Sequence, residues 1–243
     1  MVKTFKDKIE LADSFCKELL KLNLEQDLLN LALSGGSTPK VIFQTLAEKY
    51  KSKIDWNRIN LFWGDERCVS SQSDESNYGM TKKYLLDYID IPQKNVHPVD
   101  GNNNPENEAI RYSDEIKKIV PLKNGFPKFD LVMLGIGEDG HTASIFPDQM
   151  NLLESDKICE VAVHPETEQK RITLTGKVIN NAKRIIFLVT GESKAEIMKL
   201  LFEVDESKMK KYPAANINPK NGELNFFLDQ KAAQLLNKEL KSG

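Results

Sequence analysis

The chain has 243 residues, and its 34 lysines and arginines nearly balance its 36 aspartates and glutamates, which gives a formal net charge of −2 at pH 7. This balance excludes the basic footprint of a nucleic-acid-binding protein, and no apolar run approaches the length of a membrane span. Three widely spaced cysteines, and an amino terminus without the apolar core of a signal peptide, are typical of a reducing compartment. We therefore expect a cytoplasmic protein with no nucleic-acid or membrane partner.

The first elements predict an anion-binding turn. Residues 4–22 have apolar side chains at helical spacing, which predicts a covering helix, and residues 28–33 predict a strand. The strand runs into Ser-Gly-Gly-Ser-Thr-Pro at 34–39, from which we expect a helix that begins at the proline and extends to Tyr50. Such a turn exposes backbone N–H groups, hydroxyls and the positive end of a helix dipole, which together can hold a phosphate. The alternative is an ordinary capped turn. A Walker A loop is excluded because Gly-Lys-Ser/Thr is missing.

The second strand, predicted over residues 59–63, is followed at once by charged side chains. Arg67 could bind an anion or stabilise developing negative charge, while Asp65 could act as a base or orient one. The alternative for Asp65, Glu66 and Arg67 is a local ion pair on the surface. Cys68 is more typical of a small buried residue than of a nucleophile, because the chain lacks any further cysteine-protease signature.

The middle of the chain predicts scaffold. Ser76 is placed to cap a helix that extends to about Ile89, residues 90–104 form a connection rich in Pro, Asn and Gly, and residues 106–119 have helical periodicity. Neither helix shows a pattern that indicates chemistry of its own.

An apolar strand over residues 131–134 ends in a glycine-rich turn that carries Asp139 and His141. Ligands of open parallel sheets bind outside the carboxyl ends of the strands, so these two side chains are candidates for catalysis. The alternative for His141 is a hydrogen-bonded turn residue. The turn also matches Gly-x-Gly-x-x-Gly, but Pro147 would interrupt the long helix that a dinucleotide site needs, which disfavours nucleotide binding.

The last third of the chain predicts strands over 158–163, 171–175, 184–189 and 224–228, a helix that ends at Phe202 and another over 229–240. Arg171 opens one of these strands. Lys194 lies in the first turn of a helix, where a cation is unfavourable unless it meets an anion, so the residue is either a phosphate ligand or a solvated lysine. His164 precedes a proline in a segment rich in glutamate and is expected at the surface.

Together these elements predict an α/β fold: a doubly wound, mostly parallel sheet with helices on both faces, in a single domain over residues 1–243. Four predicted strands each end in a turn with functional side chains, and in such a fold all four turns can face one crevice. The turns are 34–38, 65–67, 139–141 and 190–194.

The sequence resembles the 6-phosphogluconolactonases of the glucosamine-6-phosphate isomerase/6-phosphogluconolactonase family. The resemblance rests on motifs that occur in family order over nearly the whole chain: Ser-Gly-Gly-Ser-Thr-Pro at 34–39, Trp-Gly-Asp-Glu-Arg at 63–67, Ser-Asn-Tyr at 76–78, Gly-Ile-Gly-Glu-Asp-Gly-His-Thr-Ala-Ser at 135–144, Arg-Ile-Thr-Leu-Thr at 171–175, Thr-Gly-Glu-Ser-Lys-Ala at 190–195 and Leu-Asp-Gln-Lys-Ala-Ala at 228–233. It implies hydrolysis of 6-phospho-D-glucono-1,5-lactone in the oxidative pentose phosphate pathway, with no metal or organic cofactor.

The resemblance also implies roles for individual residues. His141 would be the general base that takes a proton from water, Asp139 would hold and polarise the site, and Arg67 would stabilise the charge on the lactone oxygen or anchor the carboxyl group. The phosphate would lie in the loop of Gly35, Gly36, Ser37 and Thr38, with Arg171 and Lys194 as cationic partners. The oligomeric state stays open, with a monomer favoured.

Two rival functions can be weighed from the residues. Glucosamine-6-phosphate deaminases share the Asp-Gly-His turn, but they usually have Tyr at the position of Arg67 and Phe-Asn-Glu-Pro where this chain has Ser-Ile-Phe-Pro at 144–147. A non-catalytic phosphosugar sensor would normally carry a helix-turn-helix segment, for which this chain has neither room nor a basic patch. Both alternatives are therefore disfavoured.

Overall fold

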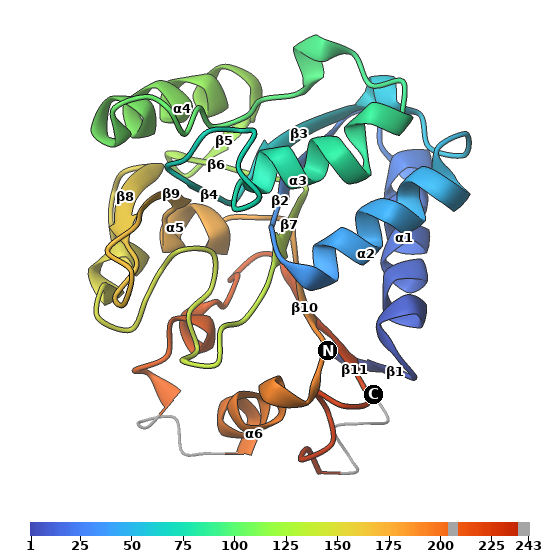
Figure 1. Cartoon of the computed structure of the whole chain (residues 1–243), viewed down its shortest axis with the longest axis vertical. Helices are drawn as coiled ribbons and strands as arrows, with labels where there is room; N and C mark the ends of the chain where they lie inside the picture. The colour runs from blue at the N-terminus through green and yellow to red at the C-terminus, as the bar shows by residue number, and fades with distance from the viewer. Residues whose placement is uncertain (204–208, 238–243) are drawn as a thin grey trace.

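A six-stranded parallel sheet forms the centre of the structure, a computed structural model that describes residues 1–203 and 209–237 (Figure 1). Across the sheet its strands are β1 (Val2–Phe5), β11 (Glu223–Asp229), β10 (Arg184–Val189), β7 (Leu131–Leu134), β2 (Leu29–Leu33) and β3 (Ile59–Trp63). The chain passes from β2 outward to β3 and then returns to the other side of β2 to form β7, so the winding direction reverses between β2 and β7. This reversal marks the ligand crevice of doubly wound folds. The predicted α/β class is confirmed.

Helices cover both faces of the sheet because alternate residues of each strand point to opposite sides. Leu31 and Leu33 of β2 join one core with α1 (Lys8–Glu25), α2 (Ser37–Thr45) and α3 (Asn77–Tyr84), whereas Ala32 joins the core on the other face. That second core includes side chains of α4 (Pro105–Ile119), α5 (Gly176–Asn180) and α6 (Ala195–Glu203), which lie across the sheet from α1 and α2 (Figure 1). No helix in the described ranges is long and apolar enough to span a membrane.

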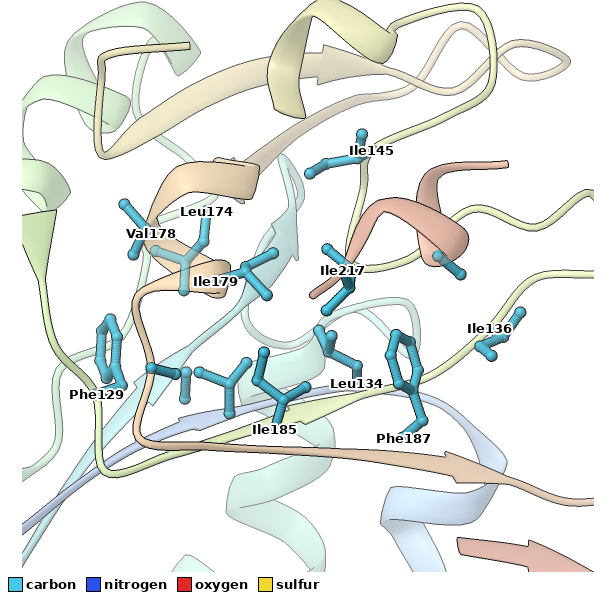
Figure 2. Packing of buried hydrophobic residues seen from close by; sticks show 14 of the residues in the cluster. Phe129, Leu134, Ile136, Ile145, Leu174, Val178, Ile179, Ile185, Phe187 and Ile217 are labelled. Carbon is cyan, nitrogen blue, oxygen red and sulfur yellow. The ribbon is translucent and has the colours of Figure 1, made fainter. Parts of the chain in front are cut away.

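A small antiparallel sheet packs over this second face. Its order is β4 (Asp65–Arg67), β9 (Lys170–Leu174) and β8 (Cys159–Val163), and a separate hairpin joins β5 (Leu122–Lys123) to β6 (Phe126–Pro127). Figure 2 shows Leu174 and Ile179 pointing toward Leu134 and Ile185 of the parallel sheet. Because β4 follows β3 after a single residue, this packing places the small sheet at the carboxyl edge of the large one.

Several boundaries differ from the sequence expectations. Residues 2–5 form an edge strand paired with β11, and the first helix begins only at Lys8, where Asp7 caps it. The helix after the glycine turn begins at Ser37 rather than at the proline, since Gly36 adopts a φ of 107° and Pro39 occupies the first turn, where its missing N–H is not needed. The helix predicted to extend to Ile89 ends at Tyr84 and is followed by a 3₁₀ turn over Leu86–Tyr88.

The end of the chain also departs from expectation. A 3₁₀ turn over Glu192–Lys194 precedes α6, so Lys194 lies before the α-helix rather than in its first turn. The predicted helix over 229–240 is wrong for residues 229–237, because Asp229 ends β11 and the residues after it form turns, with hydrogen bonds from the Gln234 N–H to the Lys231 carbonyl and from the Leu236 N–H to the Ala233 carbonyl. Residues 238–240 lie outside the described ranges.

Candidate active site

A cavity of about 240 Å³ opens at the carboxyl edge of the large sheet, beside the reversal between β2 and β7. All four predicted turns contribute to its wall. Among the sequence-predicted site residues, those that line it are Gly35, Gly36, Ser37, Thr38, Asp65, Arg67, His141, Arg171 and Lys194. Asp139 does not line the cavity but contacts His141 directly. The structure therefore brings together residues that are far apart in the sequence.

Asp139 and His141 form a hydrogen-bonded pair on one wall. His141 Nδ1 lies 2.6 Å from Asp139 Oδ1, and the His141 backbone N–H donates to the same oxygen at 3.1 Å. Burial opposes ionisation of Asp139, but these hydrogen bonds from His141 prevail and lower the pKa of the carboxyl group. The pair packs directly on Gly137, where a Cβ would lie 2.1 Å from His141 Nδ1. With Nδ1 turned to the carboxylate, Nε2 is the ring nitrogen available to a reactant.

Asp65 and Arg67, which belong to β4, form another wall of the cavity. Asp65 is buried and accepts a hydrogen bond from the Ser144 hydroxyl at 2.7 Å, which fixes the carboxylate beside the turn of His141. The Arg67 side chain donates to the backbone carbonyl of Glu75. The alternative of a surface ion pair within residues 65–67 is wrong, because both carboxylates are buried and neither accepts from the Arg67 guanidinium.

Arg67 and Arg171 face each other across β4 and β9, where they form a directly opposed pair. The Nε atoms of both are buried without a hydrogen-bond partner. Burial and the neighbouring Arg67 guanidinium lower the pKa of Arg171, whose guanidinium lies 5.6 Å from the ring centre of Phe146. Two neighbouring guanidinium groups of this kind are typical of a binding site for an anionic ligand.

The glycine turn and the β10 turn form the remaining wall. Gly36 precedes α2 and offers no side chain to cap the first N–H groups of the helix, which disfavours an ordinary capped turn and favours an anion site. The Thr38 hydroxyl oxygen lies 2.7 Å from that of Thr190, which joins α2 to the end of β10. Lys194 lines the cavity, and its Nζ lies 3.9 Å from Glu138 Oε1.

Glu66 and Asn77 belong to the surroundings of the cavity, and the sequence expectations assign neither of them a role. Glu66 is buried, and its carboxylate accepts hydrogen bonds from the Asn77 and Tyr78 N–H groups at 2.8 and 2.7 Å, which ties the start of α3 to β4. Burial raises the pKa of Glu66 despite these hydrogen bonds. Asn77 lines the cavity and lies so close to Gly35 that a Cβ there would be 1.8 Å from Asn77 Oδ1. The residue pattern indicates a helix cap at Ser76, which is confirmed, while the Ser-Asn-Tyr motif at 76–78 enters only through the family resemblance.

Three further expectations concern His164, Cys68 and the nucleotide fingerprint. His164 is half-buried before a turn, and its Nδ1 accepts hydrogen bonds from the backbone N–H groups of Glu166 and Thr167. Burial raises the pKa of the Cys68 thiol to about 11, which agrees with a packed residue rather than a nucleophile. After Gly140 the chain forms turns rather than a helix, so the nucleotide fingerprint lacks its helix, as predicted. Within the described ranges no group of three or more His, Cys, Asp or Glu side chains is arranged to hold a metal ion.

Comparison with known proteins gives consistent matches over most of the chain. The family model described as glucosamine-6-phosphate isomerases/6-phosphogluconolactonase matches residues 7–226. The 6-phosphogluconolactonase of Haemophilus influenzae is 43% identical over 225 residues, which cover 92% of this chain and 94% of that protein. The structure of the 6-phosphogluconolactonase from Trypanosoma cruzi is similar with a TM-score of 0.84 at 29% identity, covering 97% of this chain and 96% of that one.

A structure described as a monomeric glucosamine-6-phosphate deaminase is also similar. Its TM-score is 0.81 at 22% identity, and the match covers 96% of this chain and 99% of that one. At this identity the likeness shows a shared fold alone. The fold therefore does not decide between the two activities, and the side chains of the cavity must do so.

Proposed function

Because the chain belongs to the glucosamine-6-phosphate isomerase/6-phosphogluconolactonase family, we propose that it hydrolyses 6-phospho-D-glucono-1,5-lactone to 6-phospho-D-gluconate in the oxidative pentose phosphate pathway. The observation that carries the proposal is that one cavity is lined both by His141, which is paired with Asp139, and by the uncapped start of α2 together with Lys194. A lactone that carries a phosphate needs a base and an anion site of this kind in the same cavity.

In the proposed mechanism, His141 acts as the general base. Water attacks the lactone carbonyl carbon while His141 Nε2 takes a proton from that water. Asp139 accepts the Nδ1 hydrogen bond, which fixes the neutral tautomer and stabilises the imidazolium that forms. The tetrahedral intermediate then breaks its bond to the ring oxygen, and the departing alkoxide gains a proton in exchange for the one that His141 took from water, which gives the hydroxy acid and restores neutral His141.

The cationic side chains have separate proposed roles. Arg67 stabilises the negative charge that develops on the carbonyl oxygen. Asp65, fixed by Ser144, orients the groups around the reacting carbon. The phosphate accepts hydrogen bonds from the backbone of the loop at 35–38 and pairs with Arg171 and Lys194. One chain supplies all of these residues, so we propose that the active form is a monomer and that residues 1–243 act as one domain.

The test is hydrolysis of freshly generated 6-phosphogluconolactone, corrected for spontaneous opening. We expect turnover by the parent and a loss of about 10²- to 10⁴-fold in His141→Ala, the usual contribution of a general base. His164→Ala is the matched control, because His164 also packs against Phe146 but lies outside the cavity, and its activity should stay within about twofold of the parent.

Two outcomes would contradict the proposal. A parent no faster than the spontaneous reaction would refute the lactonase activity, and release of ammonia from glucosamine 6-phosphate would then indicate the deaminase. A fully active His141→Ala would leave the activity standing but refute the proposed base.

A further inference from the structure

At the carboxyl end of β11, the carboxylate of Asp229 holds the turn that follows β10. Its Oδ1 and Oδ2 lie 3.0 and 3.1 Å from the backbone nitrogen of Gly191, and Oδ1 also accepts from the Ala232 N–H at 2.7 Å. Asp229 is only 6% exposed. A buried carboxylate that receives backbone N–H donors makes charge-assisted hydrogen bonds, which are stronger than neutral ones.

The turn that Asp229 holds carries side chains of the cavity. Val189 pairs with Leu228 in the sheet, so Thr190 and Asp229 leave their strands side by side. Gly191 has a φ of 98°, a left-handed conformation that favours glycine, and its carbonyl accepts from the Lys194 N–H at 3.2 Å. The position of Gly191 therefore sets where Thr190 and Lys194 lie.

We propose that Asp229 is a positioning residue for the proposed phosphate site. Its carboxylate fixes Gly191, and through Gly191 it keeps the Thr190 hydroxyl against Thr38 and Lys194 in the wall of the cavity. The inference rests on the proposed function, because it takes Thr38 and Lys194 as phosphate ligands. A ligand site that is already ordered loses less conformational freedom on binding, so this anchoring raises affinity for the phosphate.

The test compares Asp229→Asn and Asp229→Ala by the separate KM and kcat of lactone hydrolysis. Loss of phosphate positioning removes binding that is equal in the ground and transition states, so KM should rise while kcat stays within about threefold. We expect KM to increase about 5- to 10-fold in Asp229→Asn, which keeps one acceptor oxygen, and about 30-fold or more in Asp229→Ala. If Asp229 acts by accepting hydrogen bonds, asparagine should preserve part of this function, so KM should rise less in Asp229→Asn than in Asp229→Ala.

Asp130 provides the matched control, because it is a buried aspartate at the opposite edge of the same sheet. It is 5% exposed and accepts the Asn30 N–H at 2.8 Å. Asp130→Asn should lower the unfolding midpoint without changing KM. If Asp229→Asn lowers the midpoint in the same way and leaves KM at the parent value, Asp229 is merely structural and the proposal is wrong.

A second variant covers the case in which the Asp229 variants fold poorly. Gly191→Ala meets no atom within 4 Å at its new Cβ but forces an unfavourable left-handed conformation on the turn, so it should also raise KM more than it lowers kcat. An unchanged KM in this variant would contradict the inference. A parent without lactonase activity would instead refute the proposed function, so the two failures are distinguishable.

Discussion

The amino edge and the carboxyl edge of the large sheet differ in how completely their buried polar groups are hydrogen-bonded. At the amino edge, Asn60 of β3 donates to Asn30 of β2 at 3.0 Å, Asp130 accepts the Asn30 N–H, and Lys183 Nζ lies 2.6 Å from the Asp130 carboxylate. These groups satisfy one another. At the carboxyl edge, the buried Nε atoms of Arg67 and Arg171 have no partner.

We interpret this difference as one between polar groups that hold the fold and polar groups that we propose to act on a ligand. Native proteins satisfy nearly all of their buried polar atoms, so exceptions that gather at one place indicate function. Among the described residues four buried side-chain nitrogen or oxygen atoms have no partner, and two of them belong to the arginines of the cavity. The comparison predicts that changes at the carboxyl edge cost activity and that changes at the amino edge cost stability.

Among the variants that test this comparison, Arg67→Met is expected to have the largest effect. If Arg67 stabilises the developing oxyanion as proposed, its loss should lower kcat about 10²- to 10³-fold. The free energy of unfolding should stay equal or rise slightly, because the change removes one of two like charges that face each other. The measurement is lactone hydrolysis together with denaturant unfolding.

The matched control for this prediction is Arg58→Met. Arg58 lies before β3, at the amino edge, and its guanidinium donates to the backbone carbonyls of Gln26 and Asp27. Its loss should leave kcat unchanged. Equal losses of kcat in the two variants, or a strong destabilisation by Arg67→Met, would show that the edges do not differ in the way proposed.

The carboxyl edge is also the region that the sequence predicts best, because its signals are local. A buried strand followed by Gly, Asp, Arg or His places Arg67 and His141 at the edge without knowledge of the rest of the fold. The contacts of Glu66 and Asp229 could not be predicted in this way, because their hydrogen-bond partners lie 11 and 38 residues away in the sequence. The same holds for edge strand β1, since its pairing partner β11 comes from the far end of the chain.

A smaller effect, on stability alone, is expected from Asp130→Ala at the amino edge. The substitution leaves the buried Asn30 N–H without its acceptor, which should lower the free energy of unfolding by about 1–3 kcal/mol. The ion pair with Lys183 adds little because that lysine is half exposed. Denaturant unfolding measures the loss, and kcat and KM should match the parent. A large fall in kcat would contradict the division between the edges.

His97 sharpens the comparison, because its buried Nε2 also lacks a partner although the residue does not line the cavity. The ring stacks on Phe62 at 4.6 Å, and Nδ1 lies 3.0 Å from Glu115 Oε1. Burial lowers the pKa of His97, although the facing Glu115 carboxylate opposes this shift. An unsatisfied atom away from the ligand should therefore affect stability rather than catalysis.

The sign of the pH effect follows from the lowered pKa. The unfolded chain binds the His97 proton below a pKa of about 6.5, whereas the folded protein resists it, so stability is complete above that pH and falls as the pH drops toward the lower folded pKa. In His97→Asn the free energy of unfolding should fall less between about pH 7.5 and pH 5.5 than in the parent, while lactone hydrolysis is retained. Parallel curves for the two proteins would show that His97 does not carry this dependence. Lost hydrolysis in a folded His97→Asn would place a catalytic requirement outside the carboxyl edge and break the comparison itself.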